Sequence, residues 1–127
     1  MAVAGNVYVG SAVADAPANR GWLLGHFMPA DDVRHSGEVE IKWGVHPVGD
    51  QRAAWVTGET RTTLIVLVSG CFRIEFPDRS VTLSEQGDYV VFDGVDHSWY
   101  AEAESVIVGV RWPSVPGYAL PEEIQPP

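Results

Sequence analysis

Glycine and proline interrupt this chain at short intervals. Its 127 residues include 13 glycines and 9 prolines, and the runs between them are rich in Val, Ile, Thr, Trp and Tyr. Those residues favour strands, whereas glycine and proline favour the turns that join strands. Helical periodicity is nearly absent, since only residues 29–33 suggest a turn of helix. We therefore expect an all-β protein of seven to nine short strands.

Hydrophobic patterning predicts where the strands lie. Residues 39–45 alternate apolar Val, Ile, Trp and Val with polar residues or glycine, which predicts a strand with one buried face and places His46 on the polar face. Trp43 is expected to belong to the core. Residues 62–68 are apolar on both faces, as expected inside a sandwich or closed barrel. Residues 71–76 alternate again, and the intervening Ser69-Gly70 turn predicts a hairpin. Further strands are expected at residues 81–83, 89–92, 97–100 and 105–112.

Length and charge limit the classes of function. A chain of this size has room for one domain, which we expect to span residues 1–127, with a barrel core at about 38–112 and a proline-rich tail at 113–127. The net charge of -9 opposes contact with nucleic acid. The single cysteine, Cys71, excludes an intrachain disulfide and a multi-cysteine zinc site.

The sequence also lacks targeting signals that we recognise. No apolar run approaches the roughly 18 residues of a membrane helix. The first residues are apolar and small but lack the basic start of a signal peptide. We expect a soluble, cytoplasmic protein.

One motif resembles a known family. Residues 87–99 read GDYVVFDGVDHSW: Gly-Asp, four hydrophobic residues, a turn with Asp93-Gly94, and His97 before an aromatic strand. This is similar to the second motif of the cupins, although it is one residue short in the turn and has Asp-Gly where Pro-x-Gly is usual. The resemblance covers about residues 40–112. It implies an antiparallel jelly-roll, or double-stranded β-helix, barrel.

The first cupin motif is degenerate in this chain. It normally carries His-x-His and a Glu, and its counterpart, residues 47–70, contains no histidine. Thr63 falls near the Glu position, and the paired histidines would fall among residues 55–59. Only His97 aligns with one of the four usual metal ligands. The resemblance therefore implies an intact barrel in which the metal chemistry is lost or altered.

Several side chains are candidates for a site in such a barrel. His97 is either a group in the cavity, a metal ligand or a structural histidine bonded to a backbone carbonyl. Glu59, Arg61 and Thr63 share one parity. If that parity faces inward, the two charges are held by each other or by a charged substrate in a low-dielectric cavity. If it faces solvent, they form a surface ion pair that contributes little.

Other candidates concern ligand contacts. Trp55 and Trp99 are expected near the mouth of the barrel, where they would grip a flat or apolar ligand, with Tyr100 beside them. His46 faces either the interior or the solvent, and the pattern does not decide between them.

Three functional hypotheses follow. The preferred one is a metal-independent protein that binds a small organic molecule, without a cofactor. Its chemistry would be acid–base isomerisation, dehydration or cyclisation, with His97 moving a proton and Glu59 or Arg61 orienting the substrate or neutralising its carboxylate. The first alternative is a dioxygenase-like enzyme that holds Fe, Mn, Ni or Zn through His97, Glu59 and His46. The second is a ligand sensor without chemistry. The resemblance also implies a homodimer, in which residues 7–13 could supply an edge strand.

Overall fold

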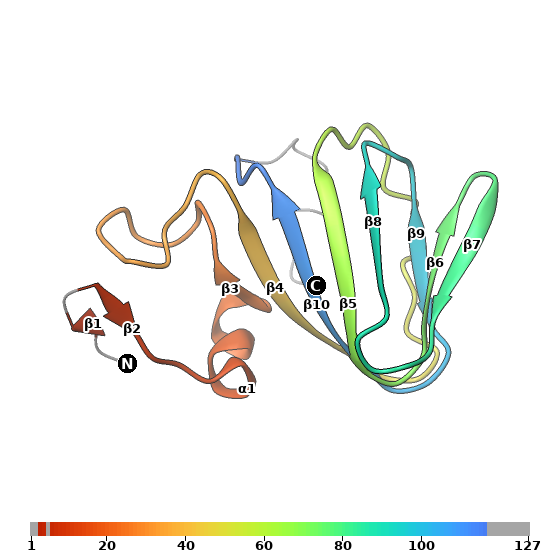
Figure 1. Cartoon of the computed structure of the whole chain (residues 1–127), viewed down its shortest axis with the longest axis horizontal. Coiled ribbons are helices and arrows are strands. Elements are labelled where there is room, and N and C mark those ends of the chain that lie inside the picture. Colours follow the sequence, from red (N-terminus) through yellow and green to blue (C-terminus); the bar gives the residue numbers. More distant parts are fainter. Residues whose placement is uncertain (1–2, 5, 117–127) are drawn as a thin grey trace. The chain divides into compact units, whose positions relative to one another are not determined.

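The computed structural model describes residues 3–4 and 6–116 (Figure 1). Within these ranges strands dominate, as predicted, and helix is confined to two short segments. The elements in chain order are β1 (Val3–Ala4), β2 (Val7–Tyr8), α1 (Ala12–Asp15), the 3-10 helix η1 (Ala16–Asn19), β3 (Trp22–Leu24), β4 (Glu40–His46), β5 (Thr62–Ser69), β6 (Phe72–Phe76), β7 (Arg79–Leu83), β8 (Tyr89–Asp93), β9 (Ser98–Ala101) and β10 (Ser105–Trp112).

The strands form three sheets. Strands β1 and β2 make a small hairpin, five strands pair in the order β3-β4-β10-β5-β8, and three pair in the order β7-β6-β9 (Figure 1). The pairings of β5 with β8 and of β6 with β7 and β9 are antiparallel. The prediction of an all-β, antiparallel jelly roll is confirmed.

The chain divides into two compact units, which are described separately. The first comprises Met1–Trp43 and Val110–Pro127, and the second comprises Gly44–Gly109. The hydrophobic core lies in the second unit and draws on both larger sheets. Its buried members are Ile65, Leu67, Phe72, Ile74, Leu83, Phe92, Ala101 and Ile107.

The sequence of strand β5 is apolar on both faces because neither face is fully exposed to solvent. Its odd-numbered residues from Thr63 to Leu67 are buried and face the core, whereas its even-numbered residues from Thr62 to Val68 are half-buried on the other face. The strand pairs with β10 on one edge and β8 on the other. An interior strand of this kind has no edge in solvent, which agrees with its continuous apolar run.

The predicted hairpin between residues 62–68 and 71–76 is wrong. Strand β5 pairs with β8, and β6 pairs with β7 and β9, so the Ser69-Gly70 turn carries the chain from one sheet to the other. Gly70 has a φ of +102°, and a Cβ there would lie 2.2 Å from the backbone oxygen of Glu104. The hairpin of this region is instead β6–β7, whose last register pair is Phe76 with Arg79.

The sequence pattern left open which face of β4 is buried, although Trp43 was expected in the core. Glu40, with 1% of its surface exposed, and Gly44 are buried, whereas Val45 on the apolar parity is 58% exposed and Trp43 is only half-buried. In the first unit, burial of Glu40 is compensated because its carboxylate lies 2.6 Å from Nη2 of Arg111. In the second unit, Gly44 lies against His46 and Ile107 because it has no side chain.

The first unit holds the helical residues. Ser11 caps α1, and its side chain accepts a hydrogen bond from the backbone of Ala14. Residues 29–33 form turns and no helix, so the helical turn expected there is wrong. Of residues 7–13, Val7 pairs with Ala4 in the β1–β2 hairpin. Among the described residues, no helix has the length and apolar character needed to cross a membrane.

Among the described residues of the C-terminal tail, Ser114 is buried, whereas residues 113, 115 and 116 are exposed, as expected for a tail that lies along the surface. The Oγ atom of Ser114 donates to Oε1 of Glu40 at 2.9 Å and accepts from the backbone nitrogen of His26 at 2.9 Å. Nδ1 of His26 lies 2.7 Å from the same hydroxyl. The rest of the predicted tail, residues 117–127, lies outside the described residues.

Candidate functional site

A row of polar side chains enters the core of the second unit. Glu59, Arg61 and Thr63 are 4%, 3% and 6% exposed, and they share the parity of the core residues Ile65 and Leu67 on β5. This parity therefore faces inward. Of the two sequence interpretations, the structure has the buried pair and not the solvent-exposed loop.

Glu59 and Arg61 bind each other closely. Oε1 of Glu59 accepts hydrogen bonds from Nε and the backbone nitrogen of Arg61 and from the backbone nitrogen of Thr60, each at 3.0 Å. Oε2 accepts from Nη2 of Arg61, also at 3.0 Å. A bidentate arrangement of this kind is strong and directional, and the two charges offset each other.

Thr63 contributes a hydroxyl with no hydrogen-bond partner. Its Oγ1 atom is buried and forms no hydrogen bond within the described residues. Thr63 pairs with Phe92 of β8 in the sheet register, so the hydroxyl lies at the level of that ring. A buried polar group without a partner costs about 1–3 kcal/mol. A bound molecule or water at this position would remove that cost.

His97 lies next to this row. It is 9% exposed, forms a bridge with Val56, and its ring packs edge-on against that of Phe92 with 4.7 Å between centroids. Nδ1 lies 3.0 Å from the carbonyl oxygen of Val95. A carbonyl only accepts, so Nδ1 must carry a hydrogen, and Nε2 is the nitrogen that has the lone pair in the neutral ring.

His46 lies on the core side of β4. Its side chain is 15% exposed, and its ring packs 4.5 Å from that of Trp99 and 5.2 Å from that of Phe72. Nδ1 lies 2.8 Å from Oδ2 of Asp50. The ring of His46 is thus held between aromatic side chains and a carboxylate.

The residues do not fit a metal site. Among the described residues, no group of three His, Cys, Asp or Glu side chains is placed so that it could hold a metal ion. His97, Glu59 and His46 are therefore not brought together as a ligand set. Both carboxylate oxygens of Glu59 already accept from Arg61.

A separate groove of about 480 Å³ collects the aromatic candidates. Trp55, which is 40% exposed, is one of its walls. His97, Glu59, Arg61 and Thr63 are not among the residues that line it. Its lining residues are Gln51, Arg52, Ala53, Trp55, Arg73, Glu75, Ser98, Trp99 and Tyr100. The candidate residues were predicted to line one cavity, but the structure divides them between this groove and the interior of the second unit.

Arg73 is fixed in this groove by two carboxylates. Its Nε atom donates to Oε2 of Glu75 at 2.9 Å, and its Nη1 atom forms an ion pair with Glu102. Partial burial acts to lower the pKa of Arg73, but the hydrogen bonds and negative charges of Glu75 and Glu102 outweigh it and raise the pKa. The guanidinium also lies over the ring of Tyr100, 4.8 Å from its centroid.

Comparison with solved structures identifies the architecture. The chain aligns with KdgF from Halomonas sp. with a TM-score of 0.56 and 20% identity over 64% of this chain and 74% of that one. An RmlC-like cupin from Desulfovibrio desulfuricans gives 0.55 and 14% over 63% and 76%. A cupin-2 domain protein from Shewanella frigidimarina gives 0.50 and 21% over 61% and 74%. The chain has the cupin fold.

Comparisons at the sequence level find nothing similar. No family model matches the chain, and no curated protein matches it significantly. The cupin fold of this chain is therefore supported by structure and by the motif around His97.

Sequence reasoning missed the polar half of the groove, which consists of Gln51, Arg52, Arg73, Glu75 and Ser98. A signal was present, because Arg73 and Glu75 alternate with Phe72, Ile74 and Phe76 and so mark the outer face of β6. Residues 51–56 run beside β9, through bridges from Gln51 to Tyr100 and from Val56 to His97. No local sequence pattern predicts this pairing, because its partners are more than 40 residues apart in the chain.

Proposed function

We propose that this cupin-fold protein binds a small organic molecule in its interior, at Thr63 and His97, without a metal ion. The observation that carries the proposal is the buried Oγ1 atom of Thr63, which has no hydrogen-bond partner among the described residues. Native proteins satisfy most buried polar groups, and exceptions call for an explanation. A ligand that hydrogen-bonds this hydroxyl supplies one.

The neighbouring charges favour a polar ligand without net charge. Glu59 offsets the charge of Arg61 through two parallel hydrogen bonds, so the pair adds little net charge to the interior. A carboxylate substrate would have to compete with Glu59 for Arg61. The role of the pair in this proposal is to fix the wall that orients the ligand.

Acid–base chemistry on the bound molecule would use His97. With Nδ1 donating to Val95, Nε2 takes a proton from the ligand. Returning that proton to another atom of the ligand gives isomerisation or cyclisation, and delivering it to a departing hydroxyl group, which leaves as water, gives dehydration; none of these changes the oxidation state. If the ligand is unchanged, the protein is a sensor.

Two substitutions at Thr63 test the binding site. Thr63→Val keeps the shape and removes the hydroxyl, whereas Thr63→Ser keeps the hydroxyl. We expect Thr63→Val to leave the free energy of unfolding unchanged or raise it by about 1 kcal/mol, and to lose the small molecule that native mass spectrometry detects on the purified parent. Thr63→Ser should retain it. A Thr63→Val variant that keeps the bound molecule contradicts the proposal.

Turnover and elemental analysis separate the remaining alternatives. If the identified molecule is converted by the parent, His97→Gln should be about 10²–10⁴-fold slower. Binding without conversion by the parent identifies a sensor. Stoichiometric Fe, Mn, Ni or Zn in the parent that disappears in His97→Ala would instead favour the metal-dependent alternative.

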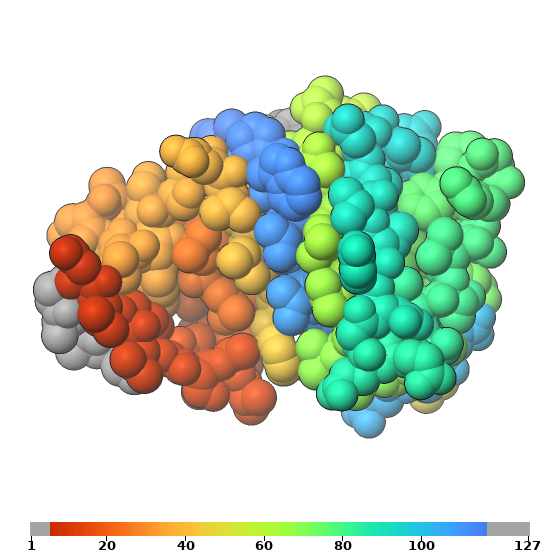
Figure 2. Space-filling model, in the orientation of Figure 1, coloured from red at the N-terminus to blue at the C-terminus, as the bar shows by residue number. Residues whose placement is uncertain are grey.

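We also propose that the protein is a homodimer. The face of β5 and β8 that points away from the core pairs Leu64 with Val91 and Val66 with Tyr89. Tyr89 is 65% exposed and Val91 49%, and Figure 2 shows β5 and β8 on one open face. Contiguous exposed apolar side chains of this kind are typical of protein interfaces.

A further inference from the structure

The groove lies on the opposite side of the three-stranded sheet from the core. Residues that face each other in antiparallel strands point to the same side. Ile74 pairs with Trp99 and both pack in the core, whereas Arg73 pairs with Tyr100 and Glu75 with Ser98. The groove residues on β6 and β9 therefore lie mainly on the outer face.

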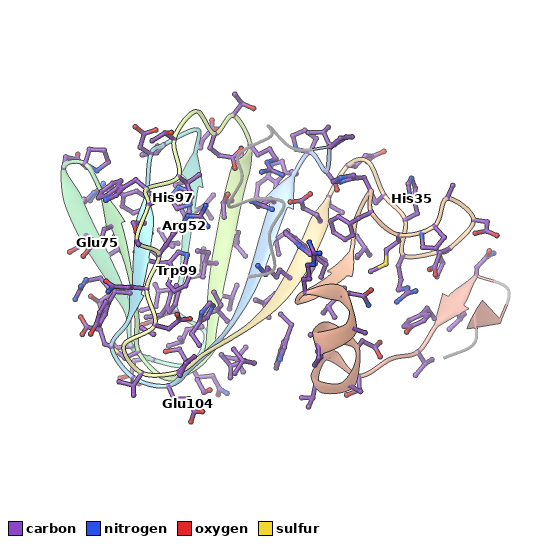
Figure 3. All side chains as sticks on the ribbon, turned by 180° about the vertical axis from the view of Figure 1, so that it is seen from behind. His35, Arg52, Glu75, His97, Trp99 and Glu104 are labelled. Carbon is purple, nitrogen blue, oxygen red and sulfur yellow. The ribbon has the colours of Figure 1, made fainter. Side chains whose placement is uncertain are left out.

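An irregular segment forms the second wall of the groove. Residues 51–56 run along β9, where the backbone nitrogen of Arg52 donates to the oxygen of Trp99 and that of Val56 to the oxygen of His97. Between these bonds the segment leaves the regular pairing, and Trp55 is left 40% exposed at the groove. Figure 3 shows Arg52 and Trp99 near β9 and Glu75 farther out on β6.

The polar groups of the groove are fixed and nearly balanced in charge. Arg73 lies between Glu75 and Glu102 and over the ring of Tyr100. Such a set presents donors and acceptors in defined directions without a large net charge. The whole chain carries a net charge of -9, which disfavours anionic ligands here.

We propose that this groove binds a neutral saccharide. Each sugar hydroxyl both donates and accepts, and the groove offers donors on Arg52 and Arg73, an acceptor on Glu75, and both on Gln51. The ring of Trp55 provides an exposed apolar surface on which the C–H face of a pyranose packs. The volume of about 480 Å³ lies within the range of small-ligand sites.

This site is independent of the interior one. None of the interior candidates lines the groove: Glu59, Arg61, Thr63 and His97 are all absent from its walls. A saccharide can therefore bind whether or not the interior holds a ligand, and the two proposals fail separately.

The test is a titration with defined sugars. Cellobiose, maltose, lactose, xylobiose and chitobiose serve as neutral probes, and digalacturonic acid and glucosamine as charged ones. Binding is measured by the indole signal of Trp55 in a ¹H–¹⁵N correlation spectrum. We expect at least one neutral disaccharide to shift this signal saturably and the anionic digalacturonic acid to bind at least tenfold more weakly.

Variants show whether the groove is responsible. Calorimetry measures the affinity of each variant for that disaccharide. Trp55→Ala should weaken the binding at least tenfold, and Gln51→Ala should weaken it at least threefold. Trp112→Ala, which removes a tryptophan that is 39% exposed on β10, and Thr63→Val in the interior should bind as the parent does. Circular dichroism establishes that each variant is folded.

Three results would overturn the proposal. The first is no saturable shift with any neutral probe at 10 mM, a concentration chosen as roughly tenfold above a weak millimolar Kd. The second is binding of the charged sugars alone. The third is a Trp55→Ala variant and a Gln51→Ala variant that both bind as tightly as the parent.

Discussion

At the scale of single residues, the buried Glu59–Arg61 pair is the feature that the sequence left undecided. The motif WVTGETRT is compatible with a surface loop and with an inward row, because alternation gives parity but not direction. What decides it is the continuation into β5, where the same parity becomes Ile65 and Leu67 of the core. The charges are buried because each satisfies the other.

Removing one charge of this pair should cost much more than removing a surface charge. Glu59→Gln leaves Arg61 buried without its counter-charge, so we expect the free energy of unfolding to fall by about 3–5 kcal/mol. Glu75→Gln is the matched control, since Glu75 pairs with Arg73 at similar distance but its side chain is 38% exposed. The control should change stability by less than about 1 kcal/mol.

Urea denaturation measures both values. Equal effects for Glu59→Gln and Glu75→Gln would mean that the Glu59–Arg61 pair is hydrated in solution, and the inward row would then be wrong.

At the scale of elements, strand β4 shows the limit of periodicity. Its alternation was recognised, but whether Ile41 and Trp43 or His46 faced the interior was left open. The structure buries Glu40 and Gly44, which share the parity of His46. Hydrophobicity fails here because the partners that allow burial, Arg111 for Glu40 and Ile107 for Gly44, come from β10, some 60 residues or more along the chain.

Adjacent substitutions on β4 test the assigned faces. A Cβ at Gly44 would lie 3.1 Å from Cγ1 of Ile107 and 2.9 Å from Nε2 of His46, whose ring is held by Trp99 and Phe72. We expect Gly44→Ala to lower the free energy of unfolding by about 1–3 kcal/mol. Val45→Ser, on the exposed face, should change it by about 0.5 kcal/mol or less.

Chemical denaturation of the two variants in parallel gives the comparison. If Val45→Ser proves the more destabilising, the strand has the opposite face in the core, as the hydrophobic pattern alone would indicate.

At the scale of the whole molecule, the motif around His97 carried most of the correct prediction. Its Gly-Asp turn, hydrophobic run and histidine indicated the cupin fold, which the solved structures confirm. Strand connectivity was less accessible, because Ser69-Gly70 has the composition of a hairpin turn but joins two sheets. The groove was not predictable, since it depends on the pairing of residues 51–56 with β9.

The apolar outer face of β5 and β8 predicts that the whole molecule associates with a second copy. Val91 lies opposite Leu64 in the register and next to the Tyr89–Val66 pair, at the centre of this apolar face. Val91→Glu would place a carboxylate without a partner in a dimer interface, so we expect it to convert a dimeric parent into a monomer.

Thr82→Glu is the control, because Thr82 pairs with Arg73 on the exposed outer face of the other sheet. It adds the same charge and should leave the dimer intact. Size-exclusion chromatography with light scattering over a range of protein concentrations measures the masses. A parent that is monomeric throughout this range contradicts the dimer, and a Val91→Glu variant that dimerises as the parent does places the interface elsewhere on the molecule.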